Sequence, residues 1–145
     1  MRRLVVGLGN PNRGEDGVGL EAVRRVQSAP TCRIMCCSDL WQLWDRADEI
    51  ILVDAMCSGA QPGTVRRFEA HADPLPTGGF VSTHALGPAE AIELARALGR
   101  LPNRVIVYGI EVGEVGSGHG MSKEVREAAR KVAEEIDDAR ANTGG

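Results

Sequence analysis

The sequence has no long hydrophobic run, and this absence excludes one broad class of protein. A helix needs about 20 consecutive apolar residues to cross a bilayer, and no stretch of the 145-residue chain approaches that length. The N-terminus is basic, but the apolar run at residues 4–8 is too short for the core of a secretory signal peptide. We therefore expect a cytoplasmic protein without membrane association, whose four cysteines stay reduced.

The sequence also lacks an excess of charge of one sign. It carries 17 Lys and Arg against 20 Asp and Glu, which gives a formal net charge of -3. This balance argues against a nucleic-acid partner, which requires a basic surface, and against a charge-rich disordered chain. The motifs of dinucleotide-binding proteins, P-loop proteins, helical zinc proteases and serine hydrolases are absent as well. None of these four common chemistries is predicted.

What the sequence does contain is an alternation of strand-length apolar runs with helix-period segments. This pattern is typical of an α/β domain with a largely parallel sheet, and the length is that of one domain, residues 1–145. Strands are predicted at residues 4–6, 31–37, 50–53, 64–69 (at a sheet edge, because it is basic) and 105–108. Helices are predicted at residues 17–28, 39–46 (capped by Asp39), 88–98 and 122–139 (capped by Ser122).

The two C-terminal helices are predicted to be amphipathic. The apolar face of the 88–98 helix includes Leu98, and the stripe of the last helix extends to Ala139. On the far face of the last helix, Glu127 and Lys131 have the spacing of a favourable ion pair. Both helices are therefore expected to cover the sheet.

Three polar side chains are expected at one edge of that sheet. In open α/β sheets, ligands bind beyond the carboxyl ends of the strands. The first strand leads into a turn-rich loop that ends at Asp16, the 50–53 strand runs directly into Asp54, and His84 precedes the 88–98 helix. Two carboxylates and one imidazole suit a borderline divalent ion such as nickel, zinc or iron. Three protein ligands also leave coordination positions free for catalysis.

Each of these residues also has an ordinary structural interpretation. Asp16 can cap the helix that it begins, His84 can be a structural histidine, and Asp54 can hydrogen-bond a neighbouring loop, since burying a carboxylate without a partner is costly. Convergence of all three on one edge is what favours a functional site.

Other residues with reactive side chains give weaker signals. No second Cys/His pair has zinc-finger spacing, so Cys32, Cys36 and Cys37 are expected to pack in the core. His71 and His119 lie in polar segments and are expected to be solvated.

Four groups of short motifs occur in order along the chain. They lie at residues 7–10 (Gly-Leu-Gly-Asn) with 15–19 (Glu-Asp-Gly-Val-Gly), 53–55 (Val-Asp-Ala) with 62–63 (Pro-Gly), 82–84 (Ser-Thr-His) and 108–111 (Tyr-Gly-Ile-Glu). Together they resemble the motifs of the nickel-iron hydrogenase maturation proteases. The resemblance implies a three-layer α/β/α sandwich with a mostly parallel, roughly five-stranded sheet. It also implies an endopeptidase that removes the C-terminal extension of a hydrogenase large-subunit precursor after nickel insertion.

By position, the resemblance assigns the catalytic and metal-contacting roles to Asp16, Asp54 and His84, and it implies that Asn10 and Thr83 bind substrate. One departure is the acidic pair Glu15-Asp16, where relatives often have Asp first and Asp or Glu second. Asp16 is shorter than a Glu, so its reach to a metal can differ, and Glu15 is the alternative ligand. Nickel is expected to arrive with the precursor, so the free enzyme holds little or no metal. That ion would polarise the scissile carbonyl or lower the pKa of a bound water, with a carboxylate as base.

Two other functions stay open on sequence grounds. Residues 7–11 also resemble the opening of bacterial peptidyl-tRNA hydrolase, but that family needs a Tyr and a catalytic His before its first long helix. Here the only Tyr is Tyr108, and no His precedes His71. The second alternative is a non-enzymatic α/β partner-binding module whose acids are only caps.

Overall fold

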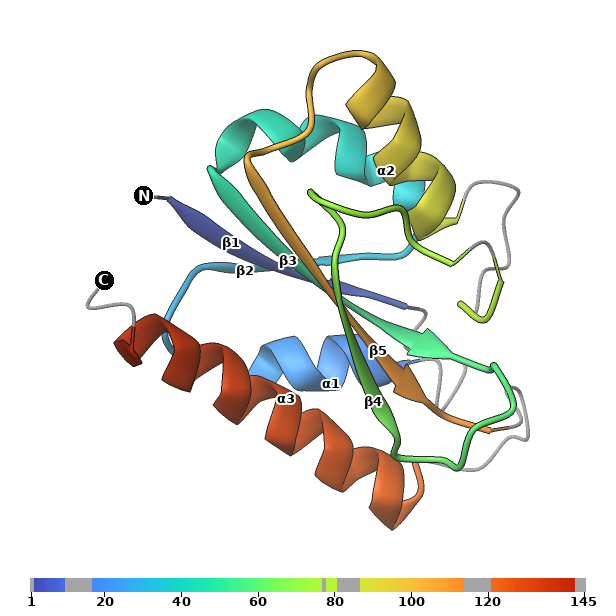
Figure 1. Cartoon of the computed structure of the whole chain (residues 1–145). Helices are drawn as coiled ribbons and strands as arrows, with labels where there is room; N and C mark the ends of the chain where they lie inside the picture. Colours follow the sequence, from blue (N-terminus) through green and yellow to red (C-terminus); the bar gives the residue numbers. More distant parts are fainter. Residues whose placement is uncertain (1, 10–16, 77, 81–86, 114–120, 143–145) are drawn as a thin grey trace.

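The fold is built around a five-stranded sheet. The computed structural model describes residues 2–9, 17–76, 78–80, 87–113 and 121–142. Within them the strands lie in the order β2-β1-β3-β5-β4 (Figure 1). The elements are β1 Arg3–Leu8, α1 Val18–Arg25, β2 Thr31–Ile34, the 3-10 helices η2 Cys37–Gln42 and η3 Trp44–Arg46, β3 Glu49–Met56, β4 Val65–Glu69, α2 Pro88–Ala97, β5 Arg104–Glu111 and α3 Lys123–Asn142.

The sheet is parallel except for one edge strand. β1 pairs in parallel with β2 and β3, and β3 with β5, whereas β4 lies antiparallel against β5. Every residue of the central strand β3 is buried, as expected for a continuous run of branched apolar residues in a parallel sheet. β4 exposes Arg66 and Arg67, and such charges discourage pairing of an open edge with another chain. The predicted mostly parallel, five-stranded sheet is confirmed.

Helices cover both faces of the sheet and produce three layers (Figure 1). α1 and α3 pack on one face, against Ile51 and Val53 of β3. α2, η2 and η3 pack on the other, against Ile50 and Leu52. Because successive residues of a strand point to opposite faces, the single strand β3 contributes to both cores. The expected α/β/α sandwich is therefore confirmed.

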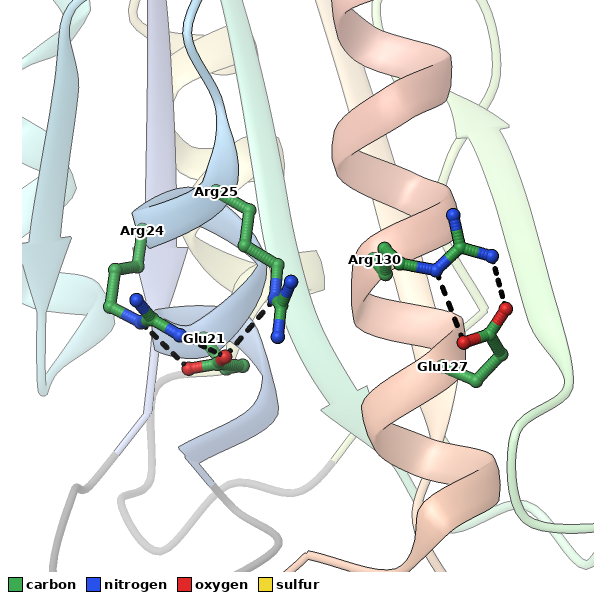
Figure 2. A network of polar contacts seen from close by, with 5 residues as sticks. All are labelled: Glu21, Arg24, Arg25, Glu127 and Arg130. Atoms are coloured by element: carbon green, nitrogen blue, oxygen red, sulfur yellow. Dashed lines mark hydrogen bonds and ion pairs between the residues drawn. The ribbon is translucent and has the colours of Figure 1, made fainter.

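The α1 and α3 helices lie on the same face and carry ion pairs on their exposed sides (Figure 2). Glu21 accepts hydrogen bonds from two arginines of its own helix. In α3, Glu127 pairs with Arg130 rather than with the predicted Lys131. The reason is that the planar guanidinium offers two N–H donors to one carboxylate. Exposed pairs of this kind contribute little to stability.

The segment after β2 departs from the sequence-based prediction. The strand predicted at residues 31–37 ends at Ile34, and the helix predicted at 39–46 is two short 3-10 helices that begin at Cys37. Cys37, Leu40 and Leu43 are buried at a spacing of three residues, which matches the three-residue turn of a 3-10 helix. Asp39 lies inside η2 and is not its N-cap, so that prediction was wrong.

The ends of the three α-helices also differ from the predictions. The helix predicted at residues 17–28 is α1, which ends at Arg25. α2 ends at Ala97, so Leu98 leaves the helix and is 57% exposed. The buried stripe of α3 ends with Ile136, and Ala139 is exposed. The predicted cap at Ser122 is confirmed, because its Oγ accepts a hydrogen bond from Val125 N–H at 3.3 Å. Among the described residues, no helix has both the length and the apolar character needed to span a membrane.

Candidate active site at the carboxyl edge of the sheet

Asp54 lies near the carboxyl end of β3. Its side chain is in register with Ile50 and Leu52, so it faces the α2 side of the sheet, and it is 0% exposed. Its Oδ1 accepts a hydrogen bond from Ala55 N–H at 2.8 Å. As the sequence indicated, this acid lies at the end of the core with a hydrogen-bond partner.

Two glycines allow α1 to pack directly on the ends of β1 and β3. A Cβ atom on Gly19 would lie 2.6 Å from the carbonyl oxygen of Leu8 and closer still to that of Val53. A Cβ atom on Gly7 would lie 2.6 Å from the carbonyl oxygen of Gly19. Since only glycine permits so close an approach, the first turn of α1 reaches the residue that directly precedes Asp54.

A second buried carboxylate, Glu111, ends β5 at the same edge of the sheet. It is 0% exposed, and it pairs in register with Met56, two residues after Asp54. Both Ser58 N–H and Ser58 Oγ donate hydrogen bonds to its carboxylate, the N–H at 3.1 Å. Sequence reasoning noted Glu111 only as part of a motif and gave it no role. Its position three residues after the end of the apolar run at residues 105–108 was the available signal.

Cys37 lies close enough to Asp54 to be affected by its charge. Burial raises the pKa of the Cys37 thiol to about 12, and the negative charge of Asp54 adds to the effect. A thiol with this pKa stays protonated at neutral pH, so it is neither a nucleophile nor a ready metal ligand. The four cysteines are free: Cys37 is buried, Cys32 and Cys36 are half-buried, and Cys57 is exposed. Core packing is thus confirmed for Cys37.

His71 was predicted to be solvated, and this was wrong. The ring is half-buried, and its Nδ1 accepts a hydrogen bond from Val105 N–H at 3.1 Å. Arg96 also donates a hydrogen bond to the His71 carbonyl at 3.2 Å. His71 therefore links the chain after β4 to the start of β5, far from the carboxyl edge. His119 lies outside the described residues.

The rest of the predicted site lies outside the described residues: Asn10, Asp16, Thr83 and His84. The described residues nearest to them in the chain lie at the carboxyl edge. Gly9 N–H donates to the carbonyl oxygen of Ile34, the last residue of β2, at 3.1 Å. Phe80 forms an antiparallel bridge with Met56 at the end of β3. Within the described ranges, no group of three His, Cys, Asp or Glu side chains is placed to hold a metal ion.

The α/β/α architecture is similar to that of solved hydrogenase maturation endopeptidases. The HycI maturation protease of Thermococcus kodakarensis has a TM-score of 0.72 and 25% identity, over 97% of this chain and 92% of that chain. The hydrogenase maturating endopeptidase HybD of E. coli has a TM-score of 0.77 and 22% identity, over 99% and 94% of the two chains. Because the sequence identity to HybD of E. coli is only 22%, that comparison concerns the fold alone.

A family model described as hydrogenase maturation protease (HycI) matches residues 37–139. This chain belongs to that family. It is 29% identical over 139 residues to the hydrogenase expression/formation protein HupD of Thiocapsa roseopersicina, covering 86% of this chain and 61% of the relative. HoxM of Cupriavidus necator, of the same description, is 28% identical, covering 87% and 67%. The chain thus spans about three fifths to two thirds of these curated relatives. Family membership favours the protease resemblance over the peptidyl-tRNA hydrolase one.

Proposed function

We propose that this chain is an endopeptidase that removes the C-terminal extension of a nickel-loaded hydrogenase large-subunit precursor. In this proposal Asp16, Asp54 and His84 recognise the nickel that the precursor carries, and Asn10 and Thr83 contact the peptide near the cut. The nickel belongs to the substrate, so the free enzyme needs no resident metal.

The observation that carries the proposal is the position of Asp54. A carboxylate buried at the carboxyl end of the central strand is where α/β proteins build ligand sites. It is found here in a chain that belongs to the hydrogenase maturation protease family. The close packing of α1 at Gly19 and the bridge between Phe80 and Met56 support the proposal, because they bring the described flanks of the Asp16 and His84 segments to the same edge.

The proposed chemistry divides between substrate and enzyme. The substrate's nickel supplies Lewis acidity, either to the scissile carbonyl or to the attacking water. The carboxylates and the imidazole hold the ion, since oxygen and nitrogen donors suit a borderline divalent metal. A carboxylate accepts the proton of the attacking water, the peptide C–N bond breaks, and that proton passes to the leaving amine. A covalent route through Cys37 is disfavoured by its pKa of about 12.

The proposal is tested by incubating the purified chain with the large-subunit precursor of its own organism, with and without nickel. We expect the precursor to shorten on a denaturing gel only when nickel is present. Asp54→Asn should lower the cleavage rate by about 100-fold or more, as loss of a general base or metal ligand does. Asp16→Ala and His84→Ala should also fail to process the loaded precursor.

The matched control is Asp138→Asn, which removes an exposed carboxylate from α3. It should cleave at the wild-type rate. Thermal melts establish that each variant is folded. Cleavage of nickel-free precursor at the same rate as loaded precursor would disprove metal recognition. Wild-type activity in a folded Asp54→Asn variant would show that Asp54 has no part in the mechanism.

A further inference from the structure

Glu111 is buried completely, and the hydrogen bonds that the described residues donate to its side chain come from a single loop. The carboxylate accepts hydrogen bonds from Ser58 N–H, at 3.1 Å to Oε2 and 3.3 Å to Oε1, and from Ser58 Oγ. Among the described residues it has no cationic partner. A buried carboxylate is costly unless its oxygens are satisfied, so Glu111 and Ser58 constrain each other strongly.

The backbone of Glu111 holds the far end of the same loop. Gly63 N–H donates to the Glu111 carbonyl at 2.8 Å, and Glu111 N–H donates to the carbonyl of Thr64 at 2.9 Å. The first residue of the loop at residues 58–63 is therefore hydrogen-bonded to the side chain of Glu111, and the last residue is hydrogen-bonded to the main chain of Glu111. One residue of β5 fixes the whole connection that follows β3.

This connection is joined directly to the end of β3 that carries Asp54. Cys57, next to Ser58, donates its N–H to the carbonyl of Gly79 at 2.6 Å. Phe80 then pairs with Met56. The bonds at Ser58 and Cys57 thus hold both the chain that leaves β3 and the residues 79–80 that lie beside it.

We propose that Glu111 is a positioning residue for the Asp54 site: through Ser58 it fixes the end of β3, and with it residues 79–80, in the geometry that cleavage requires. The inference rests on the proposed endopeptidase function. Glu111 acts through Ser58 and is not itself a group that reacts. A displacement of about 1 Å at a catalytic group costs up to about 100-fold in rate, and loss of a supporting partner typically costs about 10- to 100-fold.

The test compares Glu111→Gln, Ser58→Ala and Ser58→Thr. Glutamine at position 111 keeps one acceptor oxygen but turns an NH2 group towards Ser58. Alanine at position 58 removes only the hydroxyl donor, and threonine at position 58 keeps that donor. We expect kcat for cleavage of nickel-loaded precursor to fall about 10- to 100-fold in Glu111→Gln and less in Ser58→Ala. Ser58→Thr should retain most of the wild-type kcat.

The matched control is Glu49→Gln, which alters a buried acid at the opposite, amino end of the same sheet. It should lower Tm but leave kcat unchanged at a temperature where the protein is folded. A purely structural role for Glu111 predicts the same behaviour, so unchanged kcat in folded Glu111→Gln overturns the inference.

Hydrogen exchange separates this inference from the proposed function. In Glu111→Gln, the amides of residues 55–58 and 79–80 should exchange faster than in the wild type, while those at the amino end of β3 should not change. Equal exchange in both proteins overturns the positioning role whatever the activity. If the wild-type chain cleaves no loaded precursor, the endopeptidase proposal fails, and the inference about catalysis fails with it; faster exchange would then show only a structural anchor.

Discussion

The close packing of α1 on the sheet predicts that Gly19→Ala will destabilise the protein. The added Cβ atom would lie 2.6 Å from the carbonyl oxygen of Leu8 and closer to that of Val53, whereas real Cβ contacts below 3.0 Å essentially never occur. Both oxygens belong to the main chain of the sheet, so neither can rotate away. The helix itself must move outward, which loosens its contacts with β1 and β3.

Two effects of opposite sign set the change in the free energy of unfolding that Gly19→Ala causes. Overpacking a close contact costs about 1–3 kcal/mol, and two main-chain contacts place Gly19 at the upper end. Alanine is a better helix former than glycine and returns about 1 kcal/mol. The free energy of unfolding should therefore fall by about 2 kcal/mol. For a chain of this size that corresponds to a decrease in Tm of about 8 °C.

Urea and thermal unfolding, followed by circular dichroism, measure both quantities. Gly78→Ala is the control, because none of the described residues lies within 4 Å of the added atom and its φ is not in the left-handed region. Its stability should stay within about 0.5 kcal/mol of the wild type. A Gly19→Ala protein as stable as Gly78→Ala would refute the close approach of α1 to the ends of β1 and β3.

Two further predictions concern Cys37 and Ser122. Burial raises the pKa of Cys37 from 9.0 to about 12; since the unfolded chain releases this proton at lower pH, the free energy of unfolding should decrease between about pH 9 and pH 12. Urea titrations at several pH values should show a shallower decrease in Cys37→Ala, and an equal slope would contradict the assignment. Ser122→Ala should cost about 1 kcal/mol, because Val125 N–H loses its capping acceptor; an unchanged urea midpoint would show that the cap contributes nothing.

Local patterns predicted the sheet well because its strands are distinct in composition. The run at residues 50–53 consists of branched apolar residues, and only a strand covered on both faces buries such a run completely. The two arginines at residues 66–67 correctly indicated an edge. The same alternation of strands and helices predicts Asp54 at the carboxyl end of this strand, where the structure has it.

Contacts between distant residues could not be predicted in this way. The role of Glu111 depends on Ser58, 53 residues earlier, and the contact of His71 depends on Val105, 34 residues later. Neither pairing leaves a periodic signal in the sequence. The 3-10 helices after β2 were mistaken for an α-helix because periods of 3.0 and 3.6 residues differ little over one or two turns. The roles of Asp16 and His84 stay predictions.

The sheet buries Glu49 at the amino end of β3 and Glu111 at the carboxyl end of β5, and the two acids are satisfied differently. At the amino end, Glu49 is paired with Arg3 and with Arg104, the latter at 2.6 Å. At the carboxyl end, Glu111 is satisfied by the neutral donors of Ser58, and the described residues provide no cation for it. An ionised Glu111 with no cationic neighbour among the described residues would therefore act on a charged group that approaches this edge.

This difference bears on the identity of the substrate. Strand spacing and rise place the Cα atoms of Glu111 and Asp54 about 8 Å apart. If the charges are separated by about the same distance, and at an effective dielectric constant of about 20, an ionised Glu111 would stabilise a unit cation at Asp54 by about 2 kcal/mol. A phosphate at the same place would lose a similar amount. In the proposed function, this arrangement suits a substrate that presents a metal cation better than one that presents the anionic backbone of tRNA.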